Sequence, residues 1–509
     1  MFNIKLERKK KFTKMCAVAA CALFAGSVSV NAEDYTWKSV TAGDATTWGI
    51  RSDGSLWSWG WNEKGQGGNG VSLRTATPTL SDGNRVWKKA VGGKAYGFFL
   101  AEDGSLWAAG TAESGVQGTN DGVDHKVLTR IGTDNDWADM ACSRFWGYSA
   151  FAIKTNGTLW AWGENSAGQL GIGNTQAQTL PVQVGTDTDW KQVAAGVSSV
   201  LALKADGSLW GWGLNMYGEL FGYEGRQSSP VRLGSETDWE KVLVIEYRAY
   251  AVKKDGTLWA WGDNSRNLLG FNTPTEEEST SEGNPVEVVT EPQITKPTQV
   301  TAVEGEVLAV SGCENTLSVA TGTDGIIEKV WMFGSNADGA LGDGKGLGNG
   351  NKDIPFATVP VNPSLKSSLK FTSMSSGQNY TMMLTDDGDI WGWGCNRGGQ
   401  LGDETPNDQL QVAYKLKPIV INCPQDEVSS VGSLKDGKVD AAVSFDGQVL
   451  ALQSDGLLTS GRIYDMNGTA VMILAASETS WNVATLSQGV YVAEFMIDGA
   501  PVTYKFAVK

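Results

Sequence analysis

Few residues of this sequence could carry out chemistry, and they are far apart. Among 509 residues there is a single histidine, His125. A Ser-His-Asp or Cys-His arrangement, or a multi-histidine metal site, would have to use that one ring. No motif surrounds His125, so we interpret it as an ordinary loop residue and predict no enzyme, no catalytic residue, no cofactor and no metal site.

Acidic residues at alternate positions are the second candidate for chemistry. Three segments, 132–137, 185–190 and 234–239, place two carboxylates just before a tryptophan, as in Asp187-Thr188-Asp189-Trp190. Such spacing is compatible with calcium, but the central glycine and distal glutamate of an EF-type loop are missing. We predict turn roles, because each segment falls at the same phase of a repeat. A carboxylate-based enzyme stays open as an alternative, since paired Asp and Glu need no histidine.

The segment 163–168 has the glycine spacing that opens a phosphate loop. Gln169 and Leu170 follow it, however, in place of the lysine and Ser/Thr that contact phosphate and magnesium. Because similar segments recur along the chain, we interpret this one as a structural turn.

Aromatic and arginine side chains in predicted loops are the candidates for binding a partner, because such residues dominate the binding energy of protein interfaces. They are Trp61, Trp146, Tyr148, Tyr217, Tyr223, Arg226, Tyr247, Arg266 and Arg397. Tyr148 and Tyr247 share a phase of the repeat, which predicts that both lie on one rim of the fold. The tryptophans of the repeated Trp-x-Trp-Gly phrase alternate along strands, and we assign them to the core.

A repeat of about 50 residues must position these side chains, and this period is typical of solenoids and β-propellers. Its core phrase is Asn156-Gly157-Thr158-Leu159-Trp160, and six more copies begin at 53, 103, 206, 255, 324 and 387. Asp-Gly between two apolar runs predicts a hairpin with a two-residue type I′ turn.

The hairpin at 206–207 illustrates the expected register. With a two-residue turn there, Leu203 would face Trp210 on one side of the sheet. Ala202 would face Gly211 on the other. One face would be bulky and the other small, which suits sheets stacked around a ring. Strand-like runs before and after the hairpin complete a predicted four-stranded blade.

The phrases 160–171 and 391–402, Trp-Ala-Trp-Gly-Glu-Asn…Gly-Gln-Leu-Gly and Trp-Gly-Trp-Gly-Cys-Asn…Gly-Gln-Leu-Gly, resemble the regulator-of-chromosome-condensation repeat. The resemblance covers residues 35–422 and implies a seven-bladed propeller. Two units depart from the pattern: Ala109 replaces the second tryptophan, and the unit around Trp331 is degraded. The family's nuclear exchange activity is not carried over, because fold does not imply function and this chain reads as exported.

The N-terminal segment reads as an export signal. Residues 5–14 are rich in lysine and arginine, residues 15–30 are apolar and small, and Val30-Asn31-Ala32 fits a cleavage site. The chain carries a formal net charge of −16, which loss of residues 1–32 makes more negative. No basic cluster survives, which disfavours nucleic acid as a partner. Free thiols and disulfides both stay open for the remaining cysteines, Cys142, Cys313, Cys395 and Cys423.

The repeat ends near Cys423, and a different pattern follows. Short alternating runs divided by glycine turns predict a small β-sandwich. The phrases 463–468 (Ile-Tyr-Asp-Met-Asn-Gly) and 486–492 (Leu-Ser-Gln-Gly-Val-Tyr-Val), with the terminal Lys509, resemble the C-terminal sorting domain of type IX secretion in Bacteroidetes. The resemblance implies the type IX secretion machinery as a partner and a released or surface-tethered product.

The predicted protein is all-β. It comprises a signal peptide (1–32), a seven-bladed β-propeller (33–423), a linker (424–438) and a C-terminal sorting β-sandwich (439–509), with an acidic surface loop at 273–290. The leading hypothesis is a secreted or cell-surface interaction scaffold that binds another protein through propeller loops. The alternatives are a glycan-binding surface protein, using the loop aromatics, and the carboxylate-based enzyme.

Overall fold

The computed structural model describes residues 35–508, apart from 145–146, 265–267, 272–292, 346–355, 367, 406–413, 425–440 and the short segments 446–448, 455–457, 466–469, 476–477, 484, 488 and 498–499. The described chain consists of β-strands and two single-turn 3-10 helices. None of its helices is long and apolar enough to cross a membrane. The all-β prediction is confirmed. The predicted signal peptide, the acidic loop and most of the predicted linker lie outside the described residues.

Five sheets contain four antiparallel strands each, in chain order, and we call each sheet a blade. Blade one is β1 (Trp37–Ala42), β2 (Thr46–Arg51), β3 (Leu56–Gly60) and β4 (Thr75–Asp82). Blade two is β5 (Trp87–Gly92), β6 (Tyr96–Ala101), β7 (Leu106–Gly110) and β8 (His125–Arg130). Blade three is β9 (Trp137–Cys142), β10 (Ser149–Lys154), β11 (Leu159–Gly163) and β12 (Gln178–Gln183). Blade four is β13 (Trp190–Ala195), β14 (Ser199–Lys204), β15 (Leu209–Asn215) and β16 (Gly225–Arg232). Blade five is β17 (Trp239–Ile245), β18 (Arg248–Lys253), β19 (Leu258–Asp263) and β20 (Gln293–Gln299).

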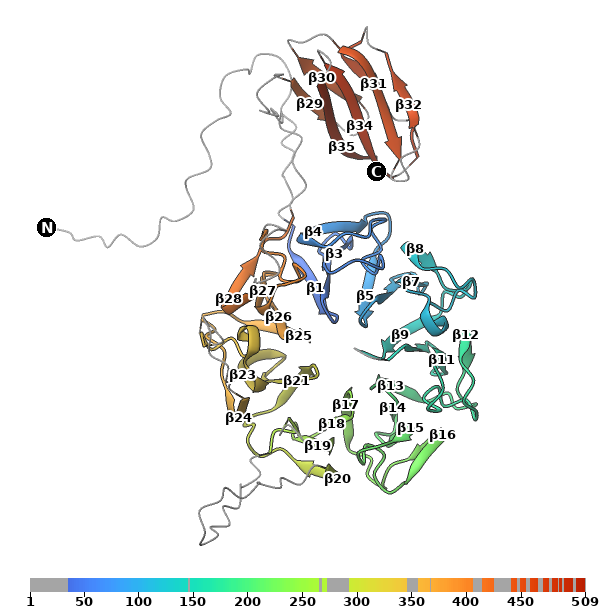
Figure 1. Cartoon of the computed structure of the whole chain (residues 1–509), viewed down its shortest axis with the longest axis vertical. Helices are drawn as coiled ribbons and strands as arrows, with labels where there is room; N and C mark the ends of the chain where they lie inside the picture. Colours follow the sequence, from blue (N-terminus) through green and yellow to red (C-terminus); the bar gives the residue numbers. More distant parts are fainter. Residues whose placement is uncertain are drawn as a thin grey trace, which may run out of the picture. The chain divides into compact units, whose positions relative to one another are not determined.

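A sixth sheet has eight strands and divides into two halves. One half, blade six, is β21 (Val307–Gly312), β22 (Thr316–Thr323), β23 (Ile326–Ser335) and β24 (Phe356–Val361). The other half, blade seven, is β25 (Phe371–Gly377), β26 (Tyr380–Thr385), β27 (Ile390–Cys395) and β28 (Tyr414–Ile421). Among the described residues, Ile327–Phe371 is the only backbone pair between the two halves. The Ser376 backbone N–H also donates to the Ser311 hydroxyl at 2.8 Å. Figure 1 shows the blades arranged around a ring, with the first strand of each nearest the centre.

Blade one packs against blade seven, and these non-covalent contacts close the ring. The backbone N–H of Trp37 donates to the carbonyl of Gly388 at 2.9 Å, and the Thr47 hydroxyl donates to the carbonyl of Gln400 at 2.7 Å. A shared cluster of buried side chains, which includes Trp59 from blade one, fills the space between the two blades. Residues more than 300 positions apart in the sequence thus form one core.

The hairpin turn at Asp206-Gly207 differs from the type I′ prediction, which is wrong. Ala202 pairs with Trp210, one position away from the expected register. Gly207 has a φ of +83°, whereas Asp206 is absent from the residues with positive φ. The connection is therefore a three-residue loop in which glycine takes the left-handed conformation.

Side-chain hydrogen bonds stabilise this turn in five of the seven copies. The Asp206 carboxylate accepts the backbone N–H of Ser208 at 2.8 Å and its hydroxyl at 2.6 Å. The Ser208 hydroxyl oxygen in turn accepts the indole N–H of Trp210 at 2.9 Å. The same relay is formed by the copies that begin at Asp53, Asp103, Asn156 and Asp255. The phrase Asp-Gly-Ser/Thr-Leu-Trp is therefore one structural unit.

The copies in blades six and seven do not form this relay. In blade seven Asp389 follows Gly388, and the Thr385 hydroxyl bonds the Asp387 carboxylate instead. The loop there keeps its three residues, because Leu384 pairs with Ile390.

The copy in blade six has a different turn. Asp324 and Gly325 have φ values of +51° and +76°, and Thr323 pairs directly with Ile326. This is the two-residue loop with positive φ at both central positions that defines a type I′ turn. Ile326 follows Gly325 here, so no hydroxyl group is present to form the relay.

The corrected register decides which side chains share a face. Trp212 and Val200 are paired, and both belong to the cluster between blades three and four. Leu201 and Leu203 belong to the cluster between blades four and five. Gly211 is paired with Leu201, and a Cβ at Gly211 would lie 2.7 Å from a methyl carbon of Leu220. Large and small residues do face each other between blades, but they are not the residues that were predicted.

Where it is present, the second tryptophan of the phrase is buried between blades, as predicted. The first tryptophan, also assigned to the core, is only partly buried in blades one to five. The Trp212 indole donates to the carbonyl of Gln169 in blade three at 2.8 Å. Blade two has Ala109 at this position, and Trp48 of blade one fills the space instead. Trp48 is buried with Ala109 in one cluster, and a Cβ at Gly92 of blade two would lie 2.2 Å from its ring.

The C-terminal residues form two further sheets. One contains β29 (Ala441–Phe445), β30 (Val449–Ser454) and β33 (Ser480–Asn482). The other contains β32 (Ala470–Leu474), β31 (Leu458–Asp465), β34 (Gly489–Ile497) and β35 (Ala500–Val508). Leu450 and Trp481 of the first sheet share one buried cluster with Ile463 and Phe495 of the second.

Candidate functional site

The two ends of the propeller carry different chemistry. Because neighbouring strands are antiparallel, the turns from first to second strand and the loops from third to fourth strand lie at one end. We call this end the loop rim. The Asp-Gly hairpins and the links between blades lie at the opposite end, which we call the hairpin rim.

The paired carboxylates lie on the hairpin rim and hold a lysine of their own chain. The ammonium group of Lys204 is 2.6 Å from Asp187 and 3.1 Å from Asp189. It also lies 5.0 Å and 4.5 Å from the ring centres of Trp190 and Trp210. Lys154 and Lys253 are held in the same way.

These lysines satisfy the carboxylates that could otherwise have bound calcium. Burial alone would lower the pKa of Lys204, but the charged hydrogen bonds that its ammonium group donates to Asp187 and Asp189 raise it. Each acidic segment thus anchors the start of an inner strand, as its predicted turn role implies. Within the described part of the chain, no group of three or more His, Cys, Asp or Glu could hold a metal ion.

His125 is the first residue of β8 rather than a loop residue. Its Nε2 atom is 2.8 Å from a carboxylate oxygen of Asp121. Asp121 lies four residues before His125, so this contact closes the loop that precedes β8. The His125–Asp121 pair contains no serine or cysteine nucleophile.

The segment 163–168 forms the structural turn that was predicted. The Asn165 side-chain oxygen Oδ1 accepts the backbone N–H of Leu170 at 2.9 Å, and its side-chain nitrogen Nδ2 donates to the carbonyl of Gln176 at 2.9 Å. The Gln169 side chain accepts the N–H of Ala167 at 2.8 Å. Both polar side chains are buried and are used to hold the loop itself.

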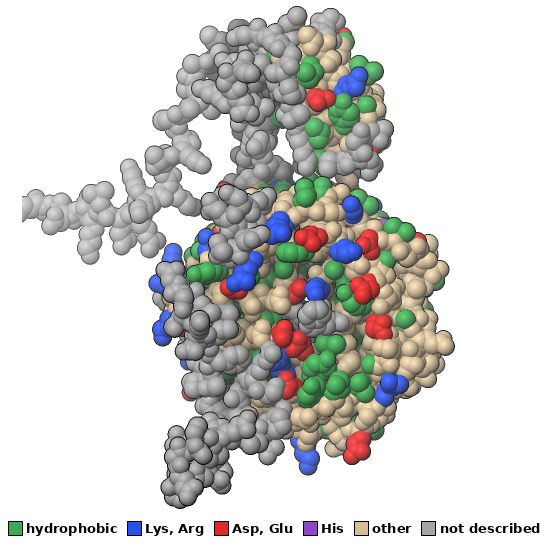
Figure 2. All heavy atoms as spheres, in the orientation of Figure 1, with side chains coloured by type: hydrophobic (Ala, Val, Ile, Leu, Met, Phe, Trp, Pro, Cys, Tyr) green, Lys and Arg blue, Asp and Glu red, His purple; other side chains and the backbone are tan. Residues whose placement is uncertain are grey.

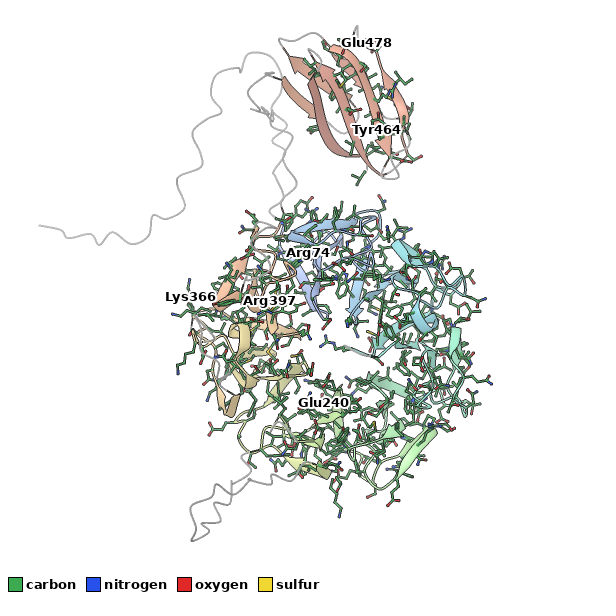
Figure 3. All side chains as sticks on the ribbon, in the orientation of Figure 1. Arg74, Glu240, Lys366, Arg397, Tyr464 and Glu478 are labelled. Carbon is green, nitrogen blue, oxygen red and sulfur yellow. The ribbon has the colours of Figure 1, made fainter. Side chains whose placement is uncertain are left out.

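Trp61 and Arg397 are brought together on the loop rim of blades one and seven. Arg74, which the sequence did not single out, stacks 4.7 Å from the Trp61 ring centre and reaches the carbonyl of Arg397 at 3.4 Å. Arg397 is exposed and pairs with Asp338 at 2.7 Å. Figure 3 labels both arginines. Arg74 lies before β4 without any motif, so only its packing reveals it.

Tyr148 and Tyr247 occupy equivalent turns, which confirms that they share a rim. The carbonyl of Tyr148 accepts an N–H from Glu164 at 2.9 Å, and that of Tyr247 accepts one from Asp263 at 3.0 Å. Burial and a hydrogen bond to Glu113 raise the pKa of Tyr148.

Tyr217 and Tyr247 form a pair across blades four and five. Their ring centres are 5.0 Å apart at an interplanar angle of 47°. The pKa of Tyr247 is raised most by burial, and then by Glu246, Tyr217 and Glu219 in decreasing order. Glu219 occupies the position of Gln169 in the preceding blade and is fully buried. Burial raises the pKa of its carboxyl group to about 7.

The remaining predicted contact residues do not join this pair. The Tyr223 hydroxyl donates to the carbonyl of Arg232 at 3.2 Å, along the outermost strand β16. Arg226 is exposed on the same strand. Trp146 and Arg266 lie outside the described residues.

Arg144 is a second residue that sequence reasoning missed. It lies in the first turn of blade three, yet its guanidinium donates to the carbonyl of Ala42 in blade one at 2.8 Å and to that of Ser376 in blade seven at 3.0 Å. Asp44 lies nearby, and burial raises the pKa of its carboxyl group to about 6, although Lys94 and Arg144 oppose the rise. Figure 2 shows charged side chains of both signs gathered around the middle of the ring.

A cavity of about 210 Å³ lies among the inner strands of blades four to six. The polar side chains of Gln192 and Lys241 that line the cavity are already hydrogen-bonded within the protein. The Gln192 side chain exchanges two hydrogen bonds with the backbone of Val242, and the Lys241 ammonium donates to the carbonyl of Leu308 at 2.9 Å.

The four described cysteines form no disulfide bonds with one another. They are Cys142, Cys313, Cys395 and Cys423.

Comparison with known proteins supports the repeat. A family model described as the regulator of chromosome condensation (RCC1) repeat matches residues 156–203, 328–384 and 387–433. A second model with that description matches 37–66, 190–219 and 371–400. The chain therefore carries RCC1 repeats.

Similar sequences match over short stretches. The ultraviolet-B receptor UVR8 of Arabidopsis thaliana is 27% identical over 26% of this chain and 26% of its own length. Protein RCC2 of Homo sapiens is 29% identical over 26% of this chain and 16% of its own length. The matched region thus spans about a quarter of these relatives or less.

Similar folds extend over most of the propeller. Prp20p from Saccharomyces cerevisiae superimposes with a TM-score of 0.59 at 16% identity, covering 77% of this chain and 89% of that one. Human WBSCR16 gives a TM-score of 0.57 at 17% identity, covering 72% and 94%. At such identities the likeness shows the propeller fold alone.

Proposed function

We propose that this protein is a secreted or cell-surface scaffold that binds another protein through the loop rim of its propeller. The observation that carries the proposal is the asymmetry of the two rims. The hairpin rim uses its lysines, carboxylates and tryptophans to stabilise its own blades. The loop rim carries Trp61, Arg74 and Arg397 in one group and Tyr217 and Tyr247 in another.

Rigid scaffolds that present aromatic and arginine side chains on loops provide the usual anchors of protein interfaces. Proteins of similar fold support a binding role in general terms. Prp20p is described with binding properties to Gsp1p and histones, and yeast RCC1 (Prp20) has been solved bound to Kap60. Those partners belong to those proteins, and the partner proposed here is a different one outside the cell.

The proposed location rests on the two ends of the sequence. The N-terminal 32 residues resemble an export signal, and residues 439–509 resemble a type IX sorting domain. Fractionation of cells that make the full chain, and a version that lacks 439–509, tests this part. The shortened chain is expected to stay in the periplasm; equal release of both chains contradicts the sorting role.

Cross-linking of the exported protein in its own cells tests the binding role. The wild-type chain is compared with Trp61→Ala/Arg397→Ala on the loop rim. Lys191→Ala, at an exposed residue of the hairpin rim, is the matched control. We expect one protein to be captured by the wild type and the control and lost with the double variant. Capture that is insensitive to the double variant, or that yields only a glycan, contradicts the proposal.

A further inference from the structure

We propose that the Tyr217–Tyr247 pair binds a cationic side chain, arginine or lysine, of the protein partner. The inference rests on the proposed binding function and adds the chemistry of one contact. It concerns the loop rim where blades four and five meet.

The geometry of the pair is that of an aromatic site for a cation. The two rings come from different blades, are 5.0 Å apart and are inclined at 47°. Neither ring is fully buried, and the neighbouring Met216 is 50% exposed. A cation within about 6 Å of a ring centre is attracted by the ring quadrupole, and two adjacent rings strengthen that attraction.

The local charge favours a positive ligand. Glu246 precedes Tyr247 in the same turn. After burial, its carboxylate is the largest cause of the raised pKa of Tyr247, so it contributes negative potential at the ring. Arg248 binds Glu246 at 3.1 Å, but it is only 2% exposed and also donates to the carbonyl of Glu314 at 2.9 Å. Its guanidinium is therefore fixed within blades five and six and is not available to cover the tyrosines.

The backbone of the turn that presents Tyr247 adds a second observation. Glu246 and Tyr247 alone connect the pair Ile245 and Arg248, and Glu246 has a φ of +55°. Residues other than glycine in this left-handed region cost about 1 kcal/mol or more, and such strain is concentrated at functional sites. The strained turn holds an aromatic ring and a carboxylate side by side on the rim.

The hairpin rim shows the same chemistry with its ligand in place. There Lys204 lies between two tryptophan rings and two carboxylates, at 4.5 Å and 5.0 Å from the ring centres. Among the described residues, the cation–π contacts are made to Tyr35 and to tryptophans, and neither Tyr217 nor Tyr247 holds a lysine or arginine. The tyrosine pair has the aromatic faces, with Glu246 next to Tyr247 in the same turn, and the partner supplies the cation.

Calorimetric titration of the full chain with three probes tests the inference. The probes are acetylated tetra-arginine, acetylated tetra-glutamate and maltotetraose. We expect only tetra-arginine to bind, and we expect Tyr247→Leu and Tyr217→Leu each to weaken that binding by roughly 3- to 30-fold. Phenylalanine at either position should retain it. Tyr464→Leu, at a partly buried tyrosine of strand β31 in the C-terminal sheets, is the matched control and should leave it unchanged.

The leucine substitutions keep the net charge, so they separate the aromatic contribution from the general attraction of an acidic protein for a cationic peptide. A melting temperature for each variant confirms that it folds. The inference fails if Tyr464→Leu weakens binding as much as Tyr247→Leu, if neither tyrosine of the pair matters, or if maltotetraose binds at the pair. Capture of a partner that is unaffected by Tyr247→Leu overturns the inference and leaves the proposed function standing.

Discussion

Replacing Glu219 with glutamine is expected to stabilise the propeller, and increasingly so at higher pH. Glu219 is 0% exposed, and its carboxylate oxygen accepts the backbone N–H of Tyr217 at 2.8 Å. Gln169 makes the corresponding bond to Ala167 at 2.8 Å in blade three. The loop therefore needs a neutral acceptor here, and blade four supplies an ionisable one.

The size of the effect follows from the pKa. Burial raises the pKa of Glu219 from 4.5 to about 7, which corresponds to about 3 kcal/mol at about 1.4 kcal/mol per pKa unit. Because the folded state binds its proton more tightly than the unfolded chain, the stabilisation is complete below pH 4.5 and is lost as the pH rises towards 7. Glutamine cannot ionise. The difference between variant and wild type should grow from near zero at pH 4.5 to about 1–3 kcal/mol at pH 8.

Urea denaturation, followed by tryptophan fluorescence between pH 4.5 and 8, measures this difference. Asp44, whose pKa burial raises to about 6, adds the same slope to both proteins and cancels in the comparison. Gln169→Glu is the matched control, because it should introduce the same pH dependence in blade three. Parallel pH profiles for the wild type and Glu219→Gln would refute the reasoning.

Substitutions at two glycines separate a close contact from backbone strain. Gly207 and Gly222 have φ values of +83° and +84°, but a Cβ at Gly207 would lie 2.2 Å from a backbone carbonyl oxygen whereas one at Gly222 would meet nothing. Gly207→Ala should therefore lower the denaturation midpoint more than Gly222→Ala, and an equal loss contradicts the role of that contact. Lys204→Met keeps the packed stem but removes the ammonium group; we expect a loss of about 1 kcal/mol in free energy of unfolding that shrinks in 1 M salt, and a salt-independent loss would speak against the ion pairs. Burial raises the pKa of Cys142 to about 12, so iodoacetamide at pH 8 should label half-exposed Cys423 first, as mass spectrometry of digests will show; rapid labelling of Cys142 would contradict its burial.

The repeat phrase made much of the fold predictable because it contains its own local interactions. Asp206, Ser208 and Trp210 are bonded to one another within five residues, so the hairpin, the blade and the buried second tryptophan could all be read from one copy. The turn type could not be read in this way. Asp-Gly suits both a two-residue and a three-residue loop. The bond from Ser208 to Asp206 stabilises the second, which moves the register by one residue, but blade seven forms the same loop at Asp387-Gly388 without a serine.

The candidate site was predictable only as a set of loops. The shared phase of Tyr148 and Tyr247 placed them on one rim, because equal positions in equal repeats occupy equal places. Their neighbours come from other repeats: Tyr217 reaches Tyr247 from the preceding blade, and Arg74 approaches Arg397 around the closed ring. No pattern along the chain encodes these approaches, since they depend on how far each blade is rotated against the next.

The sequence by itself determined the strand content, the hairpins and the small-against-large packing of blades, since these depend on contacts between residues close in the chain. Tertiary structure alone decided that Trp48 replaces the tryptophan missing at Ala109 and that Arg144 bonds to two distant blades. It also decided that the acidic pairs hold lysines. These contacts exist only once the ring brings separate repeats within hydrogen-bonding distance.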